Sequence, residues 1–261
     1  MPTNDQEAQL AAIQSEINSV PQISREVEKL QDGCSLMLEF LDNNIVLSKV
    51  TSLWKGESGR YTGIRYARRD GNCFYRSAAF AILEALVNDK KLATEFHKHI
   101  SGISSRLVED YGNFVEDFCH CALEVVEKIV SGKCTTVEQL YELSTDIDYE
   151  YTLYFFRYAV SNYIRSHEED FLPFVMGLNY DSVNSFCAAE VDAVASESDN
   201  VQVVAFARCF KVCIVVEYLD NSEGSYTTRH TFGEGTTDSP EASWIEVTLL
   251  YRPGHYDLLY K

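Results

Sequence analysis

The chain has 261 residues, of which 46% are hydrophobic and 24% are charged. This composition is ordinary for a packed globular protein, and it excludes disorder, a collagen helix or a coiled coil as a description of the whole chain. Acidic residues outnumber basic ones by 40 to 22, which gives a formal net charge of −18. This charge disfavours binding to nucleic acid and to anionic membranes, and it favours binding to proteins with a basic face.

Residues 1–31 are predicted to form an amphipathic arm in front of a body that spans 32–261. Apolar residues spaced by three or four form one stripe on a helix: Leu10, Ile13, Ile17 and Val20. After the interruption at Pro21 a similar period resumes, at Ile23, Val27 and Leu30. Such an arm either packs on the body or becomes ordered on a partner, and the pattern leaves both alternatives open.

The body is predicted to be helical first and strand-rich last. Helical periods cover 35–53, 73–88, 90–108, 113–130 and 149–165, with a loop rich in Gly, Arg and Tyr at 56–69. Residues 201–209 fit either a strand or a helix capped by Ser198 or Asp199. Strands are predicted at 212–218, 245–251 and 256–260, the last two around the turn Arg252-Pro253-Gly254. This order predicts an α+β or a mixed, helix-heavy α/β fold.

The cysteines and the chain start predict a soluble intracellular protein. Eight cysteines occur without a CxxC pair, and several lie in helical apolar patterns, which favours reduced thiols in a core over disulfides. Cys119-His120-Cys121 is a poor metal site, because residues two apart on a helix do not face each other. No signal peptide is visible, and no apolar run approaches the ~18 residues of a membrane helix.

Cys73 is the first candidate for chemistry. The turn Asp70-Gly71-Asn72 precedes it and a helix follows, so Cys73 is predicted at a helix N-terminus. Free N–H groups and the positive end of the helix dipole favour a thiolate there, and the N–H groups of Cys73 and the turn can bind an oxyanion. The alternative is structural: a small apolar residue that opens a core helix.

His255 and Asp257 form the second candidate feature. Residues two apart in a strand point to the same face, so the two side chains are expected to be neighbours. Asp257 can then accept one imidazole N–H and leave the other ring nitrogen for a thiol, as in a cysteine hydrolase. The alternative is an exposed hairpin histidine beside a solvated carboxylate.

These motifs together resemble the otubains, deubiquitinating cysteine proteases of the ovarian-tumour class. The match includes Leu83-Glu84-Ala85-Leu86, Glu197-Ser198-Asp199, Val216-Glu217-Tyr218 and, in the arm, Ile13-Gln14-Ser15-Glu16-Ile17. The two motifs of highest specificity are Asp70-Gly71-Asn72-Cys73-Phe74-Tyr75-Arg76 and Tyr251-Arg252-Pro253-Gly254-His255-Tyr256-Asp257-Leu258-Leu259-Tyr260. One departure is Arg69, where proline is expected; it lies outside the catalytic positions, and we expect it to matter little.

The resemblance implies a papain-like fold of the ovarian-tumour type, with a small central sheet among many helices, and it favours the helix at 201–209. It implies that Cys73 is the nucleophile, His255 the general base and acid, and Asp257 the orienting carboxylate. Asp70 and its turn would contribute to the oxyanion hole, mainly through backbone N–H groups. No metal or organic cofactor is implied.

The implied reaction is hydrolysis of isopeptide bonds in polyubiquitin, with a preference for chains linked through lysine forty-eight of ubiquitin and an arm that helps to bind the proximal ubiquitin. The alternative is a non-catalytic inhibitor that binds ubiquitin-conjugating enzymes and blocks ubiquitin transfer. The expected partners are therefore ubiquitin, polyubiquitin chains and conjugating enzymes, without nucleic acid or membrane. The expected location is cytoplasmic, with nuclear access left open.

Overall fold

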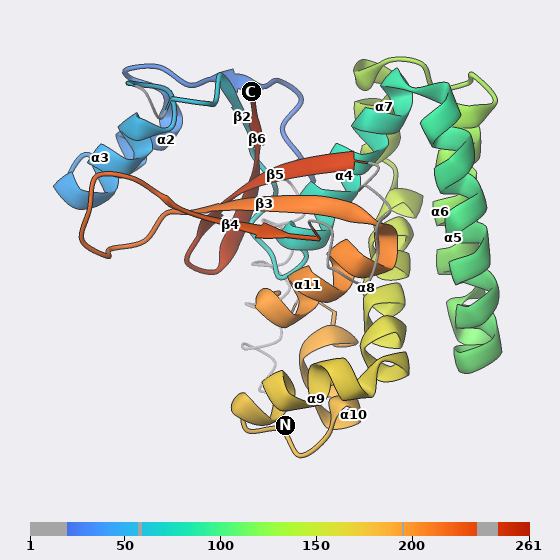
Figure 1. Cartoon of the computed structure of the whole chain (residues 1–261). Coiled ribbons are helices and arrows are strands. Elements are labelled where there is room, and N and C mark those ends of the chain that lie inside the picture. The colour runs from blue at the N-terminus through green and yellow to red at the C-terminus, as the bar shows by residue number, and fades with distance from the viewer. Residues whose placement is uncertain (1–19, 57–58, 195, 234–244) are drawn as a thin grey trace, which may run out of the picture.

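The computed structural model describes residues 20–56, 59–194, 196–233 and 245–261, and Figure 1 shows their arrangement. The apolar stripe predicted at Leu10, Ile13 and Ile17 lies outside these residues. Within them, a twisted sheet occupies the centre and helices surround it, which confirms the predicted α+β architecture.

Six strands form the sheet in the order β1-β2-β6-β5-β3-β4. Their bounds are β1 Glu28–Lys29, β2 Gly63–Arg65, β3 Val212–Tyr218, β4 Thr228–Phe232, β5 Ile245–Arg252 and β6 His255–Tyr260. β3 and β5 are parallel, and every other neighbouring pair is antiparallel. The predicted strands at 212–218, 245–251 and 256–260 are confirmed, and the β5–β6 hairpin turns where Arg252-Pro253-Gly254 predicted it.

The two faces of the sheet are covered differently. Helix α4 (Cys73–Asn88) and helix α11 (Asn200–Phe210) pack on one face, where Leu249 of β5 and Leu258 of β6 join the main core. Short helices α2 (Ser35–Glu39) and α3 (Asn44–Ser52) cover the other face, where Leu250 and Leu259 join a second, smaller core. Alternate strand residues therefore enter different cores, as the two-residue period of a strand requires.

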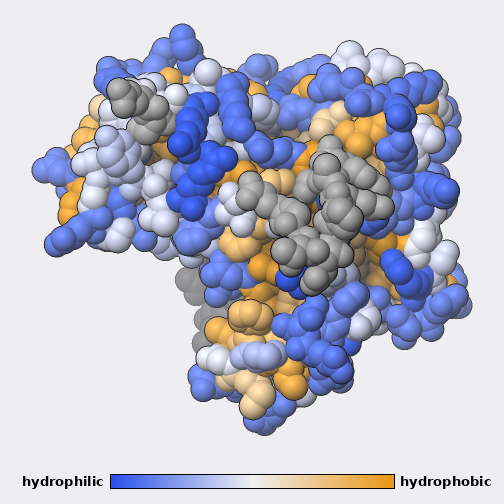
Figure 2. Space-filling model, in the orientation of Figure 1, coloured by the Kyte–Doolittle hydropathy of each residue, from blue (hydrophilic) through white to orange (hydrophobic). Residues whose placement is uncertain are grey.

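The remaining helices extend the main core away from the sheet. They are α5 (Lys90–Tyr111), the 3₁₀ turn η1 (Gly112–Val115), α6 (Glu116–Val130), α7 (Val137–Ser144), α8 (Ile147–Ser166), α9 (Glu168–Gly177), α10 (Val183–Phe186) and the π-helical turn η2 (Cys187–Val191). Figure 2 shows hydrophobic residues gathered over the α9–α10 end of the molecule, where Phe174, Met176 and Leu178 are exposed. No helix among the described residues is both long and apolar enough to span a membrane.

Helix α11 settles the ambiguity of residues 201–209 in favour of a helix. Asp199 is its N-cap and forms a capping box with Gln202. This arrangement satisfies N–H groups that the first turn of a helix leaves without partners, which is the reason a polar residue before an apolar run predicts a helix start. Phe206 of α11 then packs edge-on against Phe74 of α4, with ring centroids 5.3 Å apart.

Three predictions of local structure are wrong. Residues 23–30 are not helical: Ile23 bridges to Ala67 and β1 pairs with β2, so the second half of the predicted arm belongs to the sheet. The helix predicted at 35–53 is interrupted between α2 and α3, because Asn43 accepts the N–H of Val46 and starts a new helix. The predicted loop at 56–69 contains β2.

All eight cysteines are free, and seven of them are buried. This agrees with the predicted reduced thiols in a core. His120 is 79% exposed while Cys119 is buried, so the Cys119-His120-Cys121 triplet does not converge on one point. Within the described residues, no three metal-ligating side chains form a group that could hold an ion.

Candidate active site

Cys73 is the first residue of α4, as the sequence predicts. Asn72 is the N-cap, and the N–H of Arg76 donates to the Asn72 carbonyl at 2.9 Å. Phe74 and Tyr75 beside Cys73 are completely buried, so the start of the helix is anchored in the main core. Cys73 itself is only 3% exposed. The nucleophile candidate thus sits on a rigid element, at the helix end where the dipole favours negative charge.

Asp70 holds the turn before Cys73 in place. Its two carboxylate oxygens accept hydrogen bonds from Nη1 and Nη2 of Arg76 at 2.6 and 2.9 Å. Nε of Arg68 and the N–H of Asn72 donate to the same carboxylate at 3.0 and 2.9 Å. Burial acts to raise the pKa of Asp70, but the hydrogen bond and charge of Arg76 outweigh it, so the pKa is lowered. The carboxylate is therefore a fixed anion that shapes the turn.

The backbone N–H groups of this turn are mostly engaged. Asp70 N–H donates to the Arg68 carbonyl at 3.0 Å, and Cys73 N–H donates to the Asp70 carbonyl at 3.1 Å. Among the described residues, the N–H of Gly71 has no acceptor. Gly71 is thus the donor in this turn that is available to an incoming oxyanion without breaking another bond. The oxyanion role of Asp70 and its turn stays a prediction.

Arg157 of α8 binds the same turn through hydrogen bonds. Its Nη2 donates to the Gly71 carbonyl at 2.9 Å and to Oδ1 of Asn72 at 2.8 Å. The guanidinium also donates to the carbonyls of Val191, Ala193 and Ser196. Arg157 is 1% exposed and lies over the ring of Tyr75, 4.5 Å from its centroid. No local sequence pattern predicts the role of Arg157, because its acceptors are distant in the chain.

His255 and Asp257 are neighbours on β6, as their spacing predicts. Nε2 of His255 lies 2.9 Å from Oδ1 of Asp257, and the Ala67 N–H donates to the same oxygen at 2.9 Å. Asp257 has no exposed surface and His255 is 6% exposed, so the alternative of a solvated hairpin pair is wrong. Burial acts to raise the pKa of Asp257, but the His255 hydrogen bond and the Arg252 charge outweigh it and lower the pKa.

Two residues that the sequence reasoning did not select support Asp257. Arg252, at the end of β5, forms a buried ion pair with Oδ2 of Asp257. Its Nη1 donates to Oε2 of Glu39, the last residue of α2, at 2.5 Å. Arg69 donates to the other oxygen of Glu39 at 2.8 Å. Arg252 and Asp257 are five residues apart in the β5–β6 hairpin, but the contacts of Glu39 join residues far apart in the chain, so no local pattern could reveal them.

The Cys73 thiol lies beside the backbone of Tyr256, the residue between His255 and Asp257 on β6. The backbone N–H of Tyr256 hydrogen-bonds the Cys73 sulfur, which places the sulfur beside the strand that carries His255 and Asp257. Burial is the largest influence on the Cys73 thiol and raises its pKa to about 11, against the lowering effect of the Tyr256 N–H. Nδ1 of His255 is buried and has no hydrogen-bond partner among the described residues. The site in this structure thus holds a thiol that favours its protonated form and an imidazole nitrogen without a hydrogen-bond partner, and the two are not hydrogen-bonded to each other.

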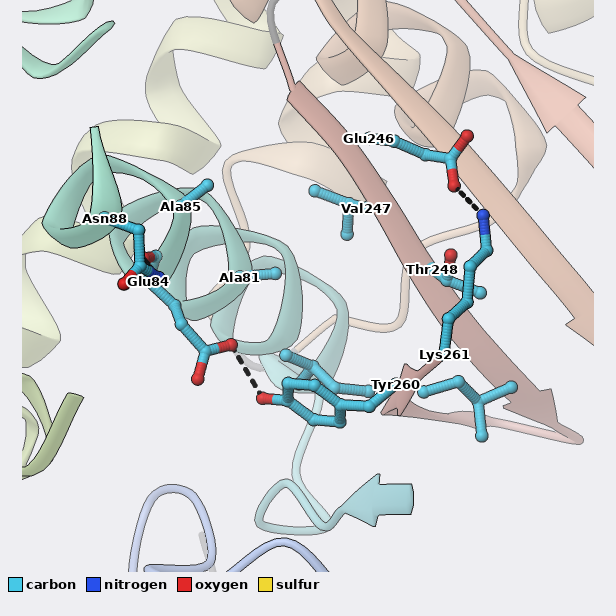
Figure 3. A pocket seen from close by; sticks show the side chains of 11 residues that line it. Ala81, Glu84, Ala85, Asn88, Glu246, Val247, Thr248, Tyr260 and Lys261 are labelled. Carbon is cyan, nitrogen blue, oxygen red and sulfur yellow. Dashed lines mark hydrogen bonds and ion pairs between the residues drawn. The ribbon is translucent and has the colours of Figure 1, made fainter. Parts of the chain in front are cut away.

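A cavity of about 450 Å³ lies elsewhere, between α4 and the β5–β6 edge. Figure 3 shows Glu84 hydrogen-bonded to the Tyr260 hydroxyl on one side and Lys261 ion-paired with Glu246 on the other. Burial raises the pKa of Glu84 above its ordinary value. None of the residues that line this cavity belongs to the Cys73, His255 and Asp257 group, so the cavity is separate from the candidate site.

Comparison with known proteins gives one consistent result. The model of the family Peptidase C65 Otubain matches residues 15–261. "Ubiquitin thioesterase OTUB1" of Homo sapiens is 35% identical over 226 residues, which cover 84% of this chain and 77% of that protein. "Ubiquitin thioesterase otubain-like" of Caenorhabditis elegans is 31% identical and covers 98% of this chain and 87% of that protein.

Solved structures agree in fold over nearly the whole chain. The complex titled "The structure of h/ceOTUB1-ubiquitin aldehyde-UBC13~Ub" has a TM-score of 0.82 at 29% identity, and the match covers 98% of this chain and 96% of that chain. A complex of h/ceOTUB1 with ubiquitin aldehyde and UBCH5B~Ub has a TM-score of 0.80 at 27% identity, with coverage of 98% and 96%. The predicted papain-like arrangement of the ovarian-tumour type is therefore the fold of this chain.

Proposed function

Because this chain belongs to the otubain family and is a cysteine-type deubiquitinase of the ovarian-tumour class, we propose that Cys73, His255 and Asp257 form its catalytic triad. The observation that carries the proposal is the convergence of three features. Cys73 opens a buried helix, its sulfur lies against the Tyr256 N–H, and His255 is hydrogen-bonded to a buried carboxylate. Its substrate is the isopeptide bond between the C-terminal glycine of ubiquitin and a lysine side chain.

His255 acts as a base rather than as half of a preformed ion pair. A thiol with a pKa near 11 is almost entirely protonated at neutral pH, so attack requires removal of its proton. Nδ1 of His255 is the ring nitrogen without a partner, while Nε2 is held by Asp257. The proton moves when the Cys73 sulfur and Nδ1 come within hydrogen-bond reach of each other in the complex with substrate.

The chemistry then follows the two-step course of a cysteine protease. The sulfur attacks the carbonyl carbon of the ubiquitin C-terminus, and the carbonyl oxygen becomes an oxyanion as the proton passes to His255. The imidazolium returns that proton to the departing lysine amine, which leaves a thioester on Cys73. Water, deprotonated by His255, hydrolyses the thioester and regenerates the thiol. The negative charge of Asp257 stabilises the imidazolium in both steps.

The oxyanion would be stabilised at the turn before α4. The Gly71 N–H is available, and the first N–H groups of α4 carry the positive end of the helix dipole. One such donor contributes about 3–4 kcal/mol to lowering the barrier in other enzymes. Arg157 binds the Gly71 carbonyl, and the Asp70 carboxylate accepts the Asn72 N–H. These two contacts hold the turn in place, so the Gly71 N–H is preorganised before substrate binds.

A preference for chains linked through lysine forty-eight of ubiquitin completes the proposal, with the arm in the first 31 residues binding the proximal ubiquitin. The amphipathic stripe at Leu10, Ile13 and Ile17 supports it, since such a stripe suits a helix that orders on a partner.

The cellular location that we propose is the cytoplasm, with access to the nucleus. Eight free cysteines support this proposal, because thiols stay reduced in that compartment. Microscopy of the tagged protein tests this location.

A second candidate function is inhibition of ubiquitin transfer without cleavage. Its support is specific: two of the solved structures that match this chain are of h/ceOTUB1 together with ubiquitin aldehyde and UBC13~Ub or UBCH5B~Ub. We propose that this chain likewise binds ubiquitin and conjugating enzymes, and that this binding does not require the Cys73 sulfur. The two functions are compatible in one molecule, because one uses the triad and the other uses a surface.

Cleavage of a panel of defined di-ubiquitins, resolved on a gel, tests both functions when wild type is compared with Cys73→Ala. We expect wild type to cleave one linkage selectively and the variant to cleave none. In a parallel transfer assay with a charged conjugating enzyme, we expect the variant to suppress transfer as well as wild type. Cleavage by Cys73→Ala would reject the triad, and loss of suppression in that variant would reject the non-catalytic role.

A further inference from the structure

The support of Asp257 continues outward in a line of alternating charges. Asp257 is bound by the buried guanidinium of Arg252, and Arg252 is bound on its other side by the carboxylate of Glu39. Arg252 is 4% exposed, whereas the Glu39 side chain is 37% exposed. The line thus runs from the imidazole of His255, through two buried groups, to the surface at the end of α2.

Arg252 fixes the orientation of the Asp257 carboxylate. Oδ1 of Asp257 accepts from His255 and from the Ala67 N–H, and Oδ2 accepts from Arg252. Nη2 of the planar guanidinium binds Asp257 and Nη1 binds Glu39, so Arg252 bridges the two carboxylates in a fixed geometry. Donors at both oxygens of Asp257 together hold the plane of its carboxylate. Because the carboxylate in turn holds Nε2 of His255, this plane sets the direction of Nδ1.

The negative charge of Glu39 offsets the effect of the positive charge of Arg252 on His255. The negative charge of Asp257 favours the imidazolium that forms on His255, but a cation in contact with Asp257 cancels much of that field. Glu39 returns a negative charge to the far side of the same guanidinium, at 2.5 Å from Nη1. Burial acts to raise the pKa of Glu39, but the hydrogen bond from Arg69 and the charge of Arg252 outweigh it and lower the pKa. Glu39 is therefore an anion at neutral pH.

We propose that Arg252 and Glu39 are positioning residues for the deubiquitinase reaction, acting on His255 through Asp257. The inference rests on the proposed triad and deepens it, because it assigns roles to two residues that act through Asp257. Arg69 ends the line at the surface. Its side chain is 62% exposed, so its charge is screened by solvent and contributes less than that of Glu39.

The test measures kcat and KM on ubiquitin with a fluorogenic amide at its C-terminus. Glu39→Gln keeps the shape of the side chain and removes its charge; we expect kcat to fall about tenfold while KM stays within about twofold, since small losses of alignment and field act on the chemical step. Glu39→Asp keeps the charge, and we expect it to recover most of the loss. Glu138→Gln is the matched control: its carboxylate pairs with Arg25 at the surface, and we expect wild-type values.

Arg252→Lys supplies a second, independent variant. Lysine keeps the charge but loses the fork, so we expect a fall in kcat at least as large as that of Glu39→Gln. Thermal unfolding of Glu39→Gln should remain close to wild type, because the substituted side chain is at the surface. Wild-type kcat in Glu39→Gln, beside an inactive Cys73→Ala, would overturn this inference alone. Equal losses in Glu39→Gln and Glu39→Asp would also overturn it, by showing that charge is not the relevant property. Full activity in Cys73→Ala would overturn the triad itself and this inference with it.

Discussion

Arg157 donates to the carbonyl oxygen of Gly71 at 2.9 Å, and this bond connects the centre of α8 to the turn that precedes Cys73. The same guanidinium reaches the segment 191–196 on its other side. The position of the Gly71 N–H, the proposed oxyanion donor, thus depends on a side chain that is itself buried. One buried guanidinium, that of Arg157, thus binds carbonyl groups of both segments and holds them in a fixed relation to each other.

Arg157→Lys should therefore lower activity and stability together. An ammonium has three donors and no planar fork, so it cannot serve the acceptors that Arg157 serves from Nη1 and Nη2. We expect kcat to fall more than tenfold and the free energy of unfolding to drop by about 2 kcal/mol or more. Urea unfolding and fluorogenic hydrolysis measure the two effects. Arg165→Lys, on the same helix but paired with Asp192 away from the turn, is the control; an equal loss of kcat there would contradict the assignment.

The substitution Asp70→Asn should make the free energy of unfolding less dependent on pH in the acid range. The pKa of Asp70 in the folded protein lies below its ordinary value, so its ionised form stabilises the fold above about pH 4 and that contribution disappears as pH falls through the folded pKa. At pH 7 we expect the variant to be less stable by about 3 kcal/mol or more, because Arg76 is fully buried and loses its counter-charge.

The difference between wild type and Asp70→Asn should shrink between pH 5 and pH 2, as wild type loses the same charge. Urea unfolding at several pH values measures this. Glu124→Gln removes an exposed carboxylate paired with Lys128 and should cost little at any pH. A difference for Asp70→Asn that stays constant across the range would show that its charge is not what holds the turn.

Asp257→Asn should abolish most hydrolysis while leaving the nucleophile in place. An amide offers one acceptor oxygen to the donors of His255, Ala67 and Arg252, and its NH₂ group opposes the imidazole N–H needed for the productive tautomer. In a serine protease the analogous change lowers kcat by about 10⁴, and we expect a loss of about 10² or more here. Fluorogenic hydrolysis measures it, and a loss smaller than threefold would contradict the orienting role.

Alkylation of the free enzyme should reveal a protonated nucleophile. Since burial raises the pKa of Cys73 to about 11, the rate of its reaction with iodoacetamide should still be rising between pH 8 and pH 10. Mass spectrometry of the peptide that contains Cys73 separates it from the other seven thiols. A rate that reaches its plateau below pH 8 would instead show a preformed thiolate.

Deletion of residues 1–19 should reduce cleavage of ubiquitin chains more than labelling of Cys73 by a ubiquitin-based electrophile, because the arm is proposed to bind only the proximal ubiquitin. The deletion should stop before Ile23 and Leu30, which are buried in the two cores. A deletion that reaches residue 30 would remove β1 and test folding instead. Equal losses of cleavage and labelling after removal of 1–19 would reject the role of the arm.

Local sequence signals predicted the parts of the site that are built from neighbours in the chain. The turn and helix start around Cys73, the β5–β6 hairpin, and the shared face of His255 and Asp257 each depend on a few consecutive residues with fixed dihedral and side-chain geometry. The helix at 200–210 required the additional information of family resemblance, since its apolar pattern also fits a strand.

Features held by contacts between distant residues were not predictable in the same way. β2 has three residues, too few to show a period, and it exists because it pairs with β6 at the other end of the chain. The exposed strand β4 was missed for a similar reason: it lacks an apolar face and is stabilised by pairing with β3. Glu39 and Arg252 likewise acquire their roles only when α2 is packed against the β5–β6 turn.

The position of β6 in the sheet has a consequence for how the protein is made. β6 is the last strand along the chain, yet it lies between β2 and β5, in the interior of the sheet order. A ribosome therefore delivers Cys73 and its helix long before it delivers His255 and Asp257. Until β6 has paired with β2 and β5, the proposed nucleophile therefore lacks its proposed base and carboxylate, so the proposed triad is complete only once this strand is in place.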